Sequence, residues 1–165
     1  MKKLFLIRHA KSSWDFSELT DFERPLNKRG RRDAPFMAKL LAQQGVSPDL
    51  IISSPATRAI TTARYFCEPL SYSFHNLTLE PRLYGASVDE IIDVICNIDN
   101  TYSNLMLFSH NPGLTDFADQ LSDKPINNIP TCGIVAFSFN IDSWNEINND
   151  SSEILFFEYP KKYFK

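Results

Sequence analysis

The stretch Leu4-Phe5-Leu6-Ile7-Arg8-His9-Ala10-Lys11 decides the fold. Its apolar half, Leu4 to Ile7, predicts a buried strand, which stops at an arginine, a histidine and, one residue further on, a lysine. Taken alone, this stretch can be explained without any function: its charged side chains could simply reach solvent at the edge of a sheet. Most isolated Arg-His pairs do no chemistry, so the meaning of this one depends on the other strand ends.

Two later strands end in the same kind of polar turn. Leu50-Ile51-Ile52 is followed by Ser53-Ser54-Pro55-Ala56-Thr57-Arg58, where Ser54 suits the N-cap of a helix and Pro55 its first position. Leu105-Met106-Leu107-Phe108 is followed by Ser109-His110-Asn111-Pro112-Gly113, with Asn111 as cap and Pro112 as first helical residue. Because a cation in the first helical turn is disfavoured by up to about 1 kcal/mol, Arg58 is best explained by a nearby anion.

The remaining pattern predicts one α/β domain over residues 1–165. A helix is expected over 27–44, kinked at Pro35 or restarted with Asp33 as N-cap, and another begins at the capping box that starts at Ser87. Further strands are expected at 77–79, 134–139 and 154–159, the last two pairing as a hairpin at the sheet edge. We therefore predict a three-layer sandwich: a mainly parallel central sheet of about six strands with helices on both faces. Parallel strands would place the three polar strand ends on one edge.

Composition excludes several classes of protein. The net charge of −3 gives no overall basic field for nucleic acid or a membrane surface. The three cysteines are far apart and show no metal or disulfide spacing, which fits a cytoplasmic protein. The apolar run at 4–7 is too short for a signal peptide. A bound phosphate would therefore have to be held by local positive groups.

Several other residues have structural readings that compete with functional ones. Residues 10–26 form a long irregular segment whose aromatic side chains argue against disorder, and it could cover a site. Trp14 and Trp144 are expected to be packing residues, and His75 an ordinary residue. The cluster Arg29, Arg31 and Arg32 is expected on a solvated helix face, although an acidic patch of a protein partner could use it.

Arg8, Arg58, His9 and His110 would converge where helix N-termini point free N–H groups. This combination describes a pocket for a phosphoryl group better than one for a planar carboxylate. A neutral imidazole is also a nucleophile that can form a covalent intermediate, and phosphoryl transfer asks the protein mainly for positioning and charge stabilisation. No metal is required for that work.

The motifs Arg8-His9-Ala-Lys11-Ser-Ser-Trp14, Arg24-Pro-Leu-Asn-Lys-Arg29-Gly30, Ser53 to Arg58 and Ser109 to Gly113 together resemble the histidine phosphatase, or phosphoglycerate-mutase-like, superfamily. The alanine after His9 and the Arg24-Pro25-Leu26 block resemble its small SixA-type branch of phosphohistidine phosphatases. The resemblance implies that His9 takes the phosphoryl group while Arg8, Arg58 and His110 clamp its oxygens. It also implies that Lys11, Ser12, Ser54 and Arg24 line the phosphate site.

Larger relatives in this superfamily carry a carboxylate general acid in a loop that corresponds to the region 80–90. The chain reads Glu80-Pro81-Arg82-Leu83-Tyr84-Gly85 there, which leaves Glu80 and Asp89 as candidates only. A protonated phosphohistidine leaves readily without a proton donor, whereas an alkoxide does not, so this departure favours phosphohistidine as substrate. The segment 68–104 also has little room for extra helices, and an open pocket would admit a protein side chain.

The sequence thus predicts a cytoplasmic, monomeric phosphatase without metal or cofactor, which hydrolyses phosphohistidine on a signalling or phosphotransfer protein through phospho-His9. Three alternatives remain open: a phosphatase of small esters such as sugar phosphates or nucleotides, a non-catalytic module that binds a phosphorylated partner, and a metallohydrolase built on His9 and His110. The last lacks any metal-binding histidine spacing.

Overall fold

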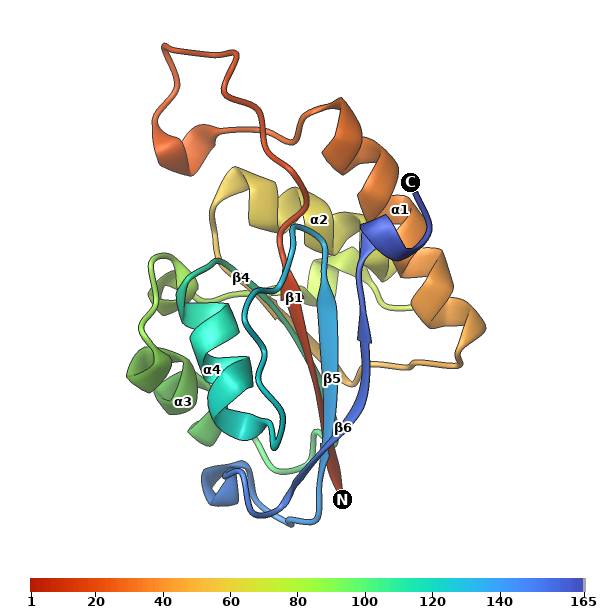
Figure 1. Ribbon diagram of the computed structural model, residues 1–165, viewed down its shortest axis with the longest axis vertical. Helices are drawn as coiled ribbons and strands as arrows, with labels where there is room; N and C mark the ends of the chain where they lie inside the picture. Colours follow the sequence, from red (N-terminus) through yellow and green to blue (C-terminus); the bar gives the residue numbers. More distant parts are fainter. Residues whose placement is uncertain (165) are drawn as a thin grey trace.

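The computed structural model describes residues 1–164 and is built around a single six-stranded sheet (Figure 1). The strand order is β3-β2-β4-β1-β5-β6. The pairs β3–β2, β2–β4 and β4–β1 are parallel, whereas β1–β5 and β5–β6 are antiparallel, which confirms a mainly parallel sheet with a hairpin at one edge. The strands are β1 (Lys2–Arg8), β2 (Leu50–Ser53), β3 (Thr78–Leu79), β4 (Asn104–Ser109), β5 (Ile134–Phe139) and β6 (Ser152–Glu158).

Helices cover both faces of the sheet, as predicted. They are α1 (Lys28–Gln43), α2 (Thr57–Cys67), α3 (Val88–Cys96) and α4 (Gly113–Leu121). Leu4 and Leu6 of β1 pack with α3 and α4, while Phe5 and Ile7 pack with α1 and α2. Burial on both faces explains why β1 is a continuous apolar run instead of an alternating one. Across residues 1–164, none of the helices is long and apolar enough to cross a membrane.

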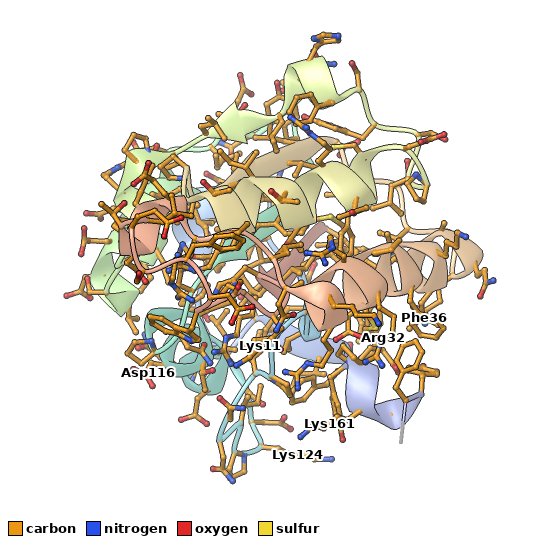
Figure 2. All side chains as sticks on the ribbon, turned by 90° about the horizontal axis from the view of Figure 1, so that it is seen from above. Lys11, Arg32, Phe36, Asp116, Lys124 and Lys161 are labelled. Atoms are coloured by element: carbon orange, nitrogen blue, oxygen red, sulfur yellow. The ribbon has the colours of Figure 1, made fainter. Side chains whose placement is uncertain are left out.

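The ends of β1, β2 and β4 meet at one edge of the sheet. Arg8 pairs in register with Ser109, and Ser53 pairs with Phe108, so the polar turns that follow these strands are neighbours. In Figure 1 this edge is at the top, where the segment 10–26 rises above the sheet, and Figure 2 looks down on it. The neighbouring strand β5 runs the other way, so the segment that precedes it also reaches this edge.

Three local predictions were wrong. α1 continues through Pro35, which overturns the alternative of a restart at Asp33: this residue lies inside the helix, buried and paired with Arg32. α2 begins at Thr57 with Ala56 as its N-cap, so the Ser54 side chain does not cap it and is left for another role. α4 begins at Gly113 after a cis Asn111-Pro112 peptide, and Asn111 Oδ1 accepts hydrogen bonds from the backbone and hydroxyl of Thr115.

The two tryptophans differ. Trp144 is fully buried, and its indole N–H donates to the Tyr102 carbonyl at 2.9 Å, as expected for a packing residue. Trp14 is 73% exposed, so its assignment to packing was wrong. The Arg24 guanidinium lies 3.6 Å from the centre of its ring, and this stacking holds the indole at the surface.

Candidate active site

A pocket of about 220 Å³ lies at the edge of the sheet where β1, β2 and β4 end. The structure brings together all four residues predicted to be catalytic, together with three of the predicted phosphate-binding residues. The lining consists of Arg8, His9, Lys11, Ser12, Trp14, Arg24, Arg58, His110, Asn111 and Thr131.

His9 follows the last residue of β1 and is 7% exposed. Its ring Nδ1 lies 2.8 Å from the carbonyl oxygen of Ala10. Since a carbonyl only accepts, Nδ1 must carry the proton, and Nε2 keeps its lone pair. Burial above all, opposed by the Ala10 hydrogen bond and assisted by the charges of His110, Arg58 and Arg8, lowers the pKa of His9 to about 3. His9 is therefore a neutral imidazole at physiological pH.

The next residue is held in place from α2. The Ala10 N–H donates to the Thr62 hydroxyl at 2.9 Å, and that hydroxyl donates to the Arg58 carbonyl at 2.7 Å. These bonds hold Ala10 against α2, the helix that carries Arg58. The carbonyl of Ala10 is the group that selects the tautomer of His9. The orientations of the His9 ring and of Arg58 are thus coupled.

His110 follows β4 and faces His9, with the ring centres 5.0 Å apart. Its Nε2 is 2.7 Å from the hydroxyl of the fully buried Ser54, which explains why that serine is not a helix cap. Burial, followed by the positive charge of Arg58, lowers the pKa of His110 to about 4. Its Nδ1 is buried and has no hydrogen-bond partner among the described residues. Ser54 therefore orients His110 from behind and does not line the pocket itself.

Arg8 and Arg58 are tethered by their outer nitrogens. Arg8 Nη1 donates to the Ile129 carbonyl at 3.0 Å, and Arg58 donates through Nη1 and Nη2 to Asp21 at 2.6 and 3.0 Å. The Nε atoms of both arginines are buried and have no partner within residues 1–164. Buried donors of this kind are costly unless an acceptor reaches them. Together with Nδ1 of His110, they suit an anion with several oxygens.

Asp21 is a residue of the site that the sequence analysis missed. Its Oδ2 accepts from Arg58 Nη2 at 3.0 Å and from the Tyr84 hydroxyl at 2.6 Å, while Oδ1 accepts from Arg24 Nε at 3.2 Å. The Tyr84 hydrogen bond, followed by the contacts with Arg58 and Arg24, lowers the pKa of Asp21 to about 2. A carboxylate in an irregular segment carries no periodic signal; its place three residues before Arg24 was the only local hint.

Arg24 and Ser12 stabilise the segment 10–26 at the rim of the pocket. Arg24 is buried, and its Nη1 donates to the Ser12 hydroxyl at 2.8 Å and to the Ser13 carbonyl at 3.2 Å. Ser12 also forms an isolated bridge with Leu26. This segment therefore does cover one side of the pocket, through an ordered network. Lys11 is only partly buried and also lines the pocket.

The two candidate general acids are not part of this assembly. Glu80 Oε1 accepts from the backbone and the Nε of Arg82, both at 3.1 Å. Asp89 is exposed in the first turn of α3. Neither residue lines the pocket.

The chemistry of the lining favours an anion over a cation. In the part of the chain that the structure describes, no group of three or more His, Cys, Asp or Glu side chains is arranged to hold a metal ion. The pocket instead gathers arginine and histidine nitrogens around His9. Guanidinium groups match tetrahedral oxyanions such as phosphate in both charge and geometry.

Comparisons with known proteins agree with this geometry. The sequence model of the histidine phosphatase superfamily (branch 1) matches residues 4–91. A chloroplastic protein of Arabidopsis thaliana, itself uncharacterised, is 34% identical over 153 residues, which are 88% of this chain and 70% of that protein.

Among solved structures, a SixA protein from Agrobacterium tumefaciens superposes with a TM-score of 0.81 at 24% identity, covering 96% of this chain and 98% of that one. The protein histidine phosphatase SixA in complex with tungstate gives a TM-score of 0.81 at 19% identity, with coverages of 97% and 98%. These likenesses show a common fold. The family match over residues 4–91, more than half of the chain, shows that this chain belongs to branch 1 of the histidine phosphatase superfamily.

Proposed function

We propose that the protein is a phosphohistidine phosphatase that transfers the phosphoryl group of a phosphorylated protein to Nε2 of His9 and then to water. The observation that carries the proposal is the arrangement around this atom. His9 is neutral with its proton fixed on Nδ1, and three buried nitrogen atoms without partners among the described residues, on Arg8, Arg58 and His110, belong to the surrounding side chains.

In the first step, the lone pair of His9 Nε2 attacks phosphorus in line with the leaving nitrogen of the substrate. The new P–N bond forms as the old one breaks, and the substrate departs as a neutral imidazole because its other ring nitrogen already carries a proton. His9 becomes a phosphorylated imidazolium whose Nδ1–H remains bonded to Ala10. Arg8 and Arg58 neutralise the oxygens of the transition state.

In the second step, water attacks the phosphorus atom from the side that the substrate has left. The P–N bond to His9 breaks, its electron pair returns to Nε2, and both protons of the water leave with the product as dihydrogen phosphate. The proposed role of His110 is to donate a hydrogen bond to a phosphoryl oxygen from Nδ1, with Nε2 held by the Ser54 hydroxyl.

Among the described residues, no carboxylic acid is poised in the pocket to donate a proton, which supports a phosphoramidate substrate over an ester. The pKa of Asp21 is lowered to about 2 by its partners, so its carboxylate is ionised and cannot donate a proton near neutral pH. Glu80 is engaged by Arg82 outside the pocket. An alkoxide leaving group needs a proton donor, whereas a protonated imidazole does not. We therefore propose a signalling or phosphotransfer protein as the partner.

Phosphate release at equal enzyme concentration tests this proposal. The substrates are a protein phosphorylated on histidine, a phosphotyrosine peptide and small esters such as sugar phosphates. We expect rapid release from phosphohistidine, at least about a hundredfold slower release from the esters, and loss of turnover in His9→Ala. His75→Ala is the matched control, since His75 is exposed and outside the pocket. Faster release from an ester would overturn the substrate class, and binding without release would indicate a phospho-binding module.

A further inference from the structure

A second cavity, of about 410 Å³, lies beside the active-site pocket. The two share Arg8, Lys11 and Thr131, so one opens next to the other along the same edge of the sheet. The other lining residues come from α1, from the segment before β5 and from the C-terminal turn: Arg29, Arg32, Asp33, Pro130, Pro160, Lys161 and Phe164. We call this cavity the basic groove.

The groove is rich in positive charge that residues 1–164 do not neutralise. Its acidic residue, Asp33, is 2% exposed and is already bonded to Arg32 Nε and Nη2 at 2.9 and 2.8 Å. The hydrogen bond of Arg29 goes to the neutral Thr131 hydroxyl at 3.4 Å. Within residues 1–164, Arg29 and Lys161 form no ion pair, although the whole chain carries a net charge of −3.

These cations lie at the start of α1, where positive charge destabilises a helix. The helix starts with Lys28-Arg29-Gly30-Arg31-Arg32 and has no acidic residue in its first turn, where its dipole already favours negative charge. Like charges placed there repel each other and the helix end. A local concentration of cations at this point is therefore best satisfied by an external anion.

The groove also has apolar walls. Pro130 and Pro160 flank it, and Phe164 is stacked against the Arg32 guanidinium at 4.0 Å. Phe164 in turn packs on Phe36 of α1, with ring centres 4.7 Å apart, which holds the C-terminal turn against the helix. Lys11, Arg32 and Lys161, which all line the groove, are labelled in Figure 2, the view from above the strand ends. Cations spaced between apolar surfaces suit a peptide with carboxylate side chains better than a compact inorganic anion.

We propose that the basic groove binds an acidic segment of the protein substrate that lies next to the phosphohistidine in the bound complex. This inference rests on the proposed function, since it identifies the substrate as a protein with Asp or Glu beside its phosphorylated histidine. Arg29 and Lys161 provide the charge for its carboxylates, and Lys11 stands where the groove meets the active-site pocket.

The test is a binding measurement that does not depend on turnover. Two fluorescent peptides each carry a stable phosphonate analogue of phosphohistidine, one flanked by glutamates and the other by glutamines at the same positions. Their Kd values are measured by anisotropy for the wild type, for a double variant Arg29→Glu/Lys161→Glu, and for Lys124→Glu. Lys124 is exposed and lies outside the groove. Its reversal changes the net charge by −2, half of the −4 in the double variant, so it measures how strongly a charge change away from the groove alters Kd.

We expect the wild type to bind the glutamate peptide about tenfold more tightly than the glutamine peptide at low salt, with the preference shrinking in about 0.5 M salt. The double variant should lose the preference, while Lys124→Glu should keep most of it. Equal Kd values for the two peptides in the wild type, or a preference that survives the double reversal, would overturn the inference. Either result is obtained even if phosphohistidine is not hydrolysed, so failure of the groove and failure of the proposed activity are distinguishable.

Discussion

Replacing Asp21 with asparagine tests whether this carboxylate positions Arg58. Asparagine keeps the size and one carbonyl oxygen, but it removes the charge and one of the two acceptors that now receive Arg58, Arg24 and Tyr84. Arg58 has 7% side-chain exposure and would lose the one ion-pair partner it has within residues 1–164. We therefore expect its guanidinium to rotate away from its present position in the pocket lining.

The expected loss of stability in Asp21→Asn depends on how exposed the Asp21 side chain is. A hydrogen bond to a buried charge contributes about 1.5 to 3 kcal/mol, but the Asp21 side chain is 50% exposed, so solvent screening reduces the loss of stability to about 1 kcal/mol. The effect on catalysis should be larger, about tenfold in kcat/KM, because small displacements of a phosphate-binding group slow the chemical step.

The assay is phosphate release from a phosphohistidine protein, together with urea unfolding. Glu23→Gln is the control, since Glu23 lies two residues away, is exposed and bonds to Thr20 instead of the site. We expect the control to keep wild-type kcat/KM within about twofold. If Asp21→Asn also kept wild-type kcat/KM, or exceeded it, the positioning role of Asp21 would be refuted.

Three further predictions concern the support of the two histidines. Ser54→Ala removes the hydroxyl 2.7 Å from His110 Nε2 and should lower the free energy of unfolding by about 1 to 2 kcal/mol, as measured in urea, and reduce kcat several-fold. Gly30→Ala would place a methyl group 2.2 Å from the Lys11 carbonyl oxygen, so α1 and the segment after His9 must separate, which should cost about 1 to 3 kcal/mol in the same assay. Because burial lowers the pKa values of His9 and His110 to about 3 and 4, their ring signals in NMR should titrate below about pH 5.

The sign of the pH effect on stability follows from the same values. Since the unfolded histidines accept protons near 6.5 and the folded ones do not, stability should be full above that pH and fall as the pH drops toward 3. Titration of either ring near 6.5 in the folded protein would contradict the assigned neutral pair.

An unchanged urea midpoint in Ser54→Ala, or in Gly30→Ala, would show that the contact in question contributes little.

The parts of the site that the sequence predicted are those that follow apolar strands. Arg8-His9 and Ser109-His110 stand at the ends of β1 and β4. Because both faces of the sheet are buried at these strands, the strands appear in the sequence as continuous apolar runs. Once the strands are taken as parallel, their ends must share an edge, so convergence of the two histidines follows from topology. The position of β1 between β4 and β5 was not predicted, because short apolar runs do not specify their neighbours.

The parts that were missed depend on contacts between distant segments. Asp21 reaches Arg58 and Tyr84 across 37 and 63 residues of sequence, and no local pattern encodes those pairings. Ser54 is of a residue type that often caps helices, but its hydroxyl lies beside His110, 56 residues further along the chain. Trp14 was expected to be a packing residue because large aromatic residues usually serve cores, whereas stacking on Arg24 stabilises it at the surface.

The formation of phospho-His9 is the central claim, and trapping it is the most direct test. The enzyme is mixed with a protein carrying radiolabelled phosphohistidine and quenched in alkali within one turnover. We predict a label on the enzyme that is stable in alkali, is lost in acid, maps to His9 by mass spectrometry and is absent from His9→Ala. Normal turnover by His9→Ala, or a label on another residue, would contradict the mechanism.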